Sequence, residues 1–141
     1  MKTLKSMLTG IALLFICVAA SATVKQSADK PTKSDVVNTY IDAIAHGKTD
    51  NLSNILDDGL QFNIVRGDNV NTLTKDQLLD YMKSNTVADA PVSTNTTIVR
   101  QDDDAYVVKV DFKYGDFTRT DTVTLENNSG WVVTKVQSTF K

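Results

Sequence analysis

The stretch AYVVKVDFKYGDFTRTDTVTLE, residues 105–126, decides what kind of fold this chain adopts. Apolar or aromatic side chains stand at every second position from 106 to 114, and the positions between them are mostly charged. Such alternation predicts a β-strand with one buried face. Gly115 and Asp116 then allow a tight hairpin, and residues 117–126 return beside the first strand. The stretch therefore predicts an antiparallel hairpin.

Further strands are predicted on both sides of this hairpin. Residues 92–100 are rich in Thr and Val, and the polar run 101–104 is typical of a turn. After the hairpin, Asn-Asn-Ser-Gly at 127–130 predicts another turn, and residues 131–140 form the last strand. The C-terminal part of the chain is therefore predicted to be a meander of four strands.

The preceding part of the chain has the patterns of helices. Apolar residues from Val36 onward recur at helical spacing, with Thr32 or Ser34 as the N-cap and Gly47 as the stop. A short second helix is predicted between Asp50, its cap, and Gly59, its end.

A small hairpin and a third helix come next. Residues 60–64 alternate as a strand does, Arg-Gly-Asp-Asn at 66–69 is a turn sequence, and 70–73 is the return strand. Thr74 and Gln77 have the spacing of a capping box, which predicts a helix after Thr74. Helices at one end and antiparallel strands at the other give an α+β fold, and a strongly bent sheet wrapped around the helices would bury both apolar sets.

Composition limits the function. The 141 residues have 41% hydrophobic and 23% charged side chains, which suits one globular domain. A net charge of −2 argues against a nucleic-acid groove. With one Cys and one His, the usual His/Cys zinc site cannot form in one chain, and we expect neither a metal nor a cofactor.

The first segment has the pattern of a secretory signal. Residues 1–22 combine two early lysines, an apolar run and the small residues before a cleavage site after Ala22. We expect cleavage there, export to the periplasm or the outside, and no stable membrane insertion afterwards. The alternative is an uncleaved membrane anchor, but the run is shorter than the roughly 20 apolar residues of a spanning helix. Residues 23–33 are predicted to be a flexible lead, and 34–141 the domain.

This order of elements resembles the nuclear transport factor 2-like superfamily. The resemblance rests on VVNTYIDAI at 36–44 with its Gly47 stop, LDDG at 56–59, the helix after Thr74, and GWVVTKV at 130–136. It implies a cone-shaped, curved antiparallel sheet wrapped on three N-terminal helices, with a pocket between them. The superfamily includes ketosteroid isomerases, scytalone dehydratases and SnoaL-like polyketide cyclases. Within it, the chain is similar to small exported bacterial proteins, some of them labelled lumazine-binding.

Charged residues lie on the predicted inner face of the strand 117–126. Arg119 and Asp121 share this face with the apolar residues of the strand. They form either a polar anchor inside the pocket or a salt bridge at its mouth. A third alternative is a bulge that turns both side chains outward. The resemblance to ketosteroid isomerases places Tyr40 and Asp121 at that family's two oxyanion donors. It places Asn63 at the position of the base, and an amide cannot abstract a proton at neutral pH.

The sequence therefore predicts an exported, non-catalytic domain that either binds a small apolar or planar ligand or serves as an accessory domain. An isomerase or cyclase that uses Asp121 and Tyr40 is the first alternative, and a homodimeric interaction module is the second. His46, at the end of the first helix, is not expected to take part in catalysis. The candidate ligand-binding residues are Tyr40, Asn63, Phe112, Arg119, Asp121 and Trp131.

Overall fold

The computed structural model describes residues 30–85 and 92–141. The predicted signal, residues 1–22, and most of the predicted lead lie outside the described residues. Contacts divide the chain into the units Met1–Pro31 and Thr32–Lys141, and the fold described below is that of Thr32–Lys141. In the described ranges, no helix has the length and apolarity needed to cross a membrane.

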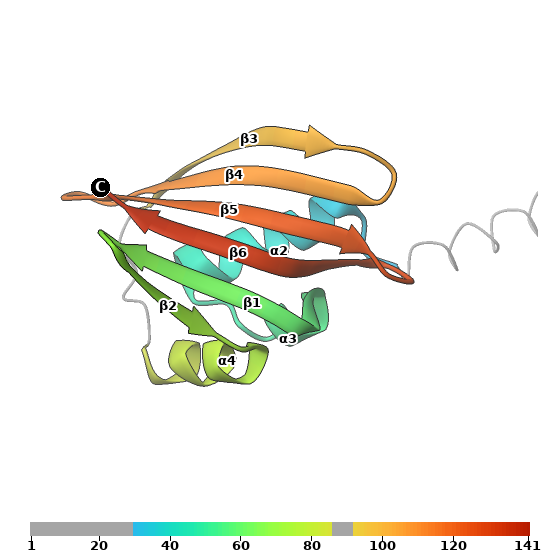
Figure 1. Cartoon of the computed structure of the whole chain (residues 1–141), viewed down its shortest axis with the longest axis horizontal. Helices are drawn as coiled ribbons and strands as arrows, with labels where there is room; N and C mark the ends of the chain where they lie inside the picture. The colour runs from blue at the N-terminus through green and yellow to red at the C-terminus, as the bar shows by residue number, and fades with distance from the viewer. Residues whose placement is uncertain (1–29, 86–91) are drawn as a thin grey trace, which may run out of the picture. The chain divides into compact units, whose positions relative to one another are not determined.

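The helices and strands follow the predicted order (Figure 1). They are α2 (Lys33–His46), α3 (Leu52–Ile55), β1 (Leu56–Arg66), β2 (Asn69–Leu73), α4 (Lys75–Ser84), β3 (Ser93–Gln101), β4 (Ala105–Lys113), β5 (Thr118–Asn127) and β6 (Trp131–Phe140).

Three of the five predicted helix caps and stops are present. The Thr32 side chain accepts from the backbone of Asp35 and closes a capping box, and Thr74 does the same with Gln77. Gly47 takes a left-handed conformation with φ 67° and ends α2. The prediction that Asp50 caps the second helix is wrong, because the N-cap of α3 is Asn51. The prediction that Gly59 ends the second helix is wrong, because α3 stops at Ile55 and Gly59 lies inside β1. The register of β1 against β6 shifts between Leu56 and Gln61, so this glycine marks an irregularity in a strand.

The six strands form one sheet in the order β2-β1-β6-β5-β4-β3. Every neighbouring pair is antiparallel except β1 and β6, which run parallel. The expected sheet is purely antiparallel, and this one parallel pair departs from it. Parallel neighbours need a long connection, and α4 with the strands β3, β4 and β5 lies between β1 and β6 along the chain. The edge strand β3 is exposed along its whole length.

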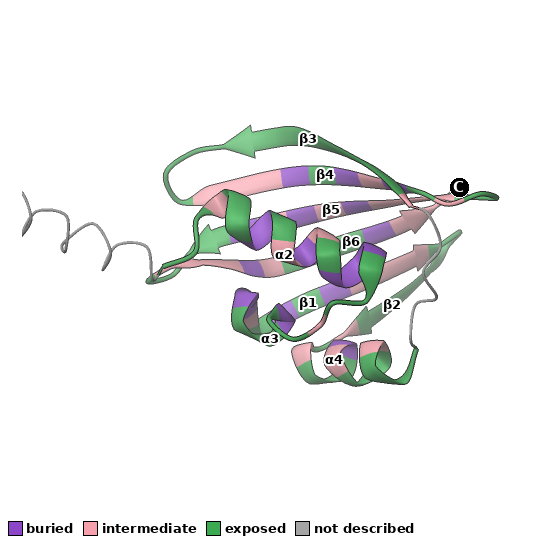
Figure 2. Ribbon diagram, turned by 180° about the vertical axis from the view of Figure 1, so that it is seen from behind, coloured by how far each residue is buried: buried purple, intermediate pink, exposed green. Residues whose placement is uncertain are grey.

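The core lies between the helices and one face of the sheet. Figure 2 shows α2 crossing β4, β5 and β6, while α4 lies beside β1 and β2. Val36, Tyr40 and Ile44, one turn apart on α2, are buried against the inner sides of the strands. The inner row of β5 is buried at Asp121, Val123 and Leu125, as the alternation of its sequence predicts. One polar residue, Asp121, therefore stands in an apolar row.

Gly47 offers a test of the cap that ends α2. Gly47→Ala should lower the free energy of unfolding by about 1 kcal/mol, because an alanine side chain disfavours the left-handed conformation. Gly115→Ala is the matched control, since a Cβ there meets no atom within 4 Å. Urea denaturation of both variants measures the difference, and equal stabilities would contradict the role given to Gly47.

Candidate functional site

A buried carboxylate is the centre of the polar groups inside this fold. Asp121 is fully buried and accepts from the Tyr40 hydroxyl at 2.5 Å and from the Ser138 hydroxyl at 2.6 Å. Arg119 donates to both of its oxygens, from Nε at 2.8 Å and from Nη2 at 2.9 Å. A buried charge is tolerated when it is paired and its lone pairs are bonded, and four donors meet that requirement here.

Strand register brings these groups together from distant parts of the sequence. In the pairing of β5 with β6, Asp121 stands opposite Ser138 and Arg119 stands opposite Phe140. In the pairing of β4 with β5, Phe112 stands opposite Arg119. Directly opposite residues project to the same face, so Phe112, Arg119 and Phe140 form one inward row and Asp121 and Ser138 part of the next.

The helix completes the cluster from the other side of the core. Tyr40 lies on the buried face of α2, and its ring is fully enclosed. Burial, together with the Asp121 carboxylate, raises the pKa of Tyr40 well above its ordinary value of 10.0. For Arg119, burial alone would lower the pKa, but the attraction of Asp121 outweighs it and the pKa is raised. The phenol therefore stays a donor and the guanidinium stays charged at neutral pH.

Three aromatic rings surround the guanidinium of Arg119. Its Cζ atom lies 5.8 Å from the ring centroid of Phe62 and 5.9 Å from those of Phe112 and Phe140. A cation at such distances is attracted by the rings, and the attraction increases where water is excluded. The side chain is only 17% exposed, so these rings and Asp121 together fix its position.

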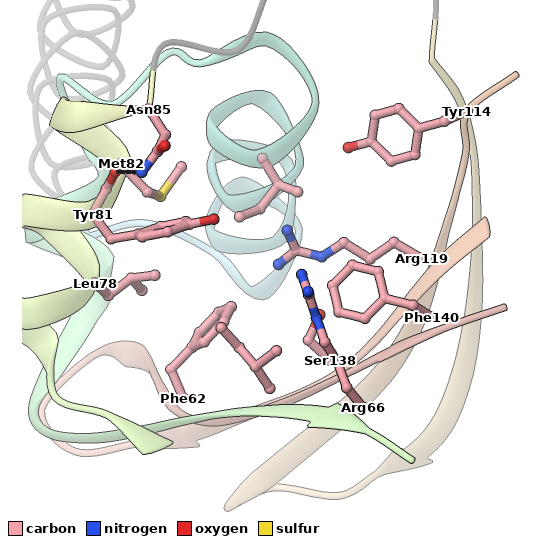
Figure 3. Close-up of a pocket in the computed structure, with 12 residues that line it drawn as sticks. Phe62, Arg66, Leu78, Tyr81, Met82, Asn85, Tyr114, Arg119, Ser138 and Phe140 are labelled. Atoms are coloured by element: carbon pink, nitrogen blue, oxygen red, sulfur yellow. Dashed lines mark hydrogen bonds between the residues drawn. The ribbon is translucent and has the colours of Figure 1, made fainter. Parts of the chain in front are cut away.

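A cavity of about 150 Å³ lies beside this guanidinium, between the sheet and α4 (Figure 3). Figure 3 shows Tyr81 and Met82 reaching in from the helix, with Arg66 and Arg119 reaching in from the strands. The lining residues are Ile44, Phe62, Ile64, Arg66, Leu78, Tyr81, Met82, Asn85, Tyr114, Arg119, Ser138 and Phe140.

Of the candidate residues named from the sequence, the structure brings Tyr40, Arg119 and Asp121 into contact. Arg119 lines the cavity, whereas Tyr40 and Asp121 are fully buried behind it and are not among its lining residues. Phe112 is buried against Arg119 and is not part of the lining either. The polar anchor inside the domain is thus Arg119, held from behind by Asp121.

Two further candidates lie away from the cavity. Phe62 and Ile64 line it, so Asn63 between them points to the other face of β1, where it accepts from Thr72 on β2 at 2.8 Å. Phe140, at the end of β6, lines the cavity. Trp131 begins the same strand and therefore lies about 30 Å away from Phe140. The Trp131 ring lies 5.1 Å from the Lys33 ammonium.

Sequence reasoning missed several cavity residues. Arg66 falls in the predicted turn sequence 66–69 and Tyr81 in the predicted helix after Thr74, and neither pattern indicates a role in binding. Ser138 and Phe140 had a usable signal, because pairing β5 with β6 through the turn at 127–130 places them opposite Asp121 and Arg119. Among the described residues, no three His, Cys, Asp or Glu side chains gather as a metal ion would require.

Comparison with known families gives one match over most of the chain. The family described as "Putative lumazine-binding" matches residues 28–138. No curated protein sequence matches the chain.

Solved structures share the arrangement of helices and sheet. An NTF-2 like protein of unknown function from Silicibacter pomeroyi is 15% identical, with a TM-score of 0.62 over 84% of this chain and 97% of that one. An NTF2-like protein of unknown function from Shewanella baltica is 17% identical, with a TM-score of 0.63 over 77% and 90%. A protein titled "putative ketosteroid isomerase" from Parabacteroides distasonis is 11% identical, with a TM-score of 0.59 over 79% and 95%. The predicted superfamily and α+β fold are confirmed, and identities this low show the fold alone.

The buried ion pair can be tested through stability. Asp121→Asn keeps the size of the side chain but leaves Arg119 without a counter-charge, so the free energy of unfolding should fall by about 3 kcal/mol in urea denaturation. Asp102→Asn is the matched control, because it removes an exposed pair with Arg100 and should cost far less. Equal losses would mean that the buried cluster contributes no more than a surface pair.

The buried Tyr40 phenol should make the free energy of unfolding depend on pH in the alkaline range. Unfolding returns the raised pKa of Tyr40 to its ordinary value of 10.0. The folded chain therefore keeps this proton where the unfolded chain has lost it, so this contribution is complete below pH 10 and is lost as pH rises toward the folded pKa. Tyr40→Phe should make the decline above pH 10 shallower in urea denaturation at stepped pH.

Tyr81→Phe is the control for this measurement, because that ring is already 52% exposed in the folded chain. Its stability should decline with pH as that of the unmodified protein does. If Tyr40→Phe declined as steeply as the unmodified protein, the Tyr40 phenol would not be the group that titrates.

Proposed function

The chain belongs to the family described as "Putative lumazine-binding", and on that premise we propose that it is an exported, non-catalytic protein that binds a small planar ligand in the cavity beside Arg119. Export rests on the sequence of residues 1–22, with its two lysines, apolar run and small residues before the cleavage site. The binding role rests on the cavity.

The walls of the cavity suit a flat, largely apolar molecule. Phe62, Tyr81 and Phe140 provide aromatic surfaces, and Leu78 and Met82 provide aliphatic ones. Ligand sites are typically apolar concavities with a few placed polar groups, and Arg119 is such a group here. A cavity of about 150 Å³ has room for one benzene-sized ring. A four-ring steroid would need a far larger space.

The observation that carries the non-catalytic assignment is the chemistry of the lining. Among the described residues that line the cavity, none is Asp, Glu, His, Cys or Lys. General acid–base catalysis needs a group that gains or loses a proton near the working pH. Arginine does not, and burial raises the pKa of Tyr114 further from neutrality. Asp121 is behind the lining, and both of its oxygens are occupied.

The isomerase or cyclase alternative needs the opposite arrangement. An acid that stabilises an oxyanion must donate a hydrogen bond toward the substrate. Asp121 is instead an acceptor for four donors, one of which is the Tyr40 hydroxyl that would otherwise be the second oxyanion donor. Neither residue is among those lining the cavity. These contacts favour binding over catalysis.

Benzamide, a neutral one-ring molecule, tests the cavity as a binding site. In an NMR titration of the protein it should shift the resonances of Tyr81 and Phe140 first, because both line the cavity. Met82→Trp should abolish these shifts, since a larger side chain from α4 fills the space. Val99→Trp, on the exposed strand β3, is the control and should leave them unchanged. The proposal fails if benzamide shifts no cavity resonance or if Met82→Trp binds it as well as the unmodified protein.

A further inference from the structure

The charged groups of the cavity are all of one sign. Twelve residues line it, and the two charged ones among them are Arg66 and Arg119. Both guanidinium carbons lie within 6 Å of the same ring, at 5.2 Å from the centroid of Phe140 for Arg66 and 5.9 Å for Arg119. Figure 3 shows both side chains directed into the same space.

The two arginines differ in how their charge is balanced. Arg119 is paired with Asp121, as described above. Arg66 forms no ion pair with any described residue, and it is exposed at the end of β1. One positive charge at the cavity is therefore uncompensated. A cavity wall with an unbalanced cation raises the local concentration of anions and favours their binding.

Arg119 also keeps unused donors. Asp121 occupies its Nε and Nη2 edge, and Nη1 has no hydrogen-bond partner among the described residues. Arg119 lines the cavity, and Figure 3 shows its guanidinium directed into it. An arginine held along one edge by a carboxylate presents its remaining N–H groups in a fixed direction, and such groups suit a carboxylate or phosphate.

The aromatic residues of the cavity indicate the shape of the uncharged part of the ligand. Beside the arginines, Phe62, Phe140 and Tyr81 form a space sized for one flat ring. Figure 3 shows the Tyr81 hydroxyl directed toward the Arg119 guanidinium, where it can bond the same anionic group. Resting on the proposed function, we propose that the natural ligand is a small planar carboxylate, with its carboxylate between Arg66 and Arg119 and its ring against Phe140 and Tyr81.

Benzoate and benzamide test this assignment because they share a ring and differ in charge. Isothermal titration calorimetry of the full chain should show benzoate binding at least about tenfold more tightly than benzamide, as expected for a charge-assisted hydrogen bond. Arg66→Gln should weaken benzoate about tenfold and benzamide much less, because only benzoate loses a charge-assisted contact. Arg66 is chosen over Arg119 because the buried Asp121 needs Arg119 for stability.

Arg100→Gln is the matched control, since it removes an exposed arginine from β3 that does not line the cavity. It should leave both affinities unchanged. Equal affinities for benzoate and benzamide would overturn the carboxylate assignment and leave the proposed binding function standing. Binding of neither molecule would overturn both. Inorganic phosphate that binds more tightly than benzoate would overturn the planar carboxylate in favour of a phosphate ligand.

Discussion

The buried carboxylate of Asp121 is the contact on which the rest of this structure depends. It joins α2 to the sheet through Tyr40, joins β5 to β6 through Ser138, and holds the guanidinium of Arg119 from one side. Leaving a buried charge unpaired costs several kcal/mol, so helix and strands gain stability when all four donors are in place. A slip of β5 by one residue would move Asp121 to the outer face and lose its contacts with Tyr40 and Ser138.

The cavity follows from this arrangement. Because Asp121 and three aromatic rings fix Arg119, its free N–H groups point into the cavity without further ordering of the side chain. A binding group that is already ordered loses less entropy when a ligand arrives. Asp121 is therefore a positioning residue, and Arg119 is the residue that contacts the ligand. Other proteins with this fold can place different chemistry in the same space, since the fold itself does not determine function.

Periodic patterns predicted most of the fold, and strand pairing decided most of the site. The alternation at 105–126 and the capping boxes at Thr32 and Thr74 gave the elements and their order, because each depends on neighbouring residues. The parallel pairing of β1 with β6 joins segments separated by most of the domain, and no local pattern carries it. Tyr40, Arg119 and Asp121 were predicted from alternation and resemblance. Arg66 was missed because its local sequence is a turn, and its role depends on Phe140, which lies on another strand.

A crystal structure of the protein with bound benzoate tests the central claim most directly. The account predicts the carboxylate within hydrogen-bonding distance of Arg119 Nη1 and facing Arg66, the ring between Tyr81 and Phe140, and Asp121 still bonded to the other edge of Arg119. Benzoate bound away from these two arginines, or an Asp121 side chain turned from Arg119 toward the ligand, would contradict it.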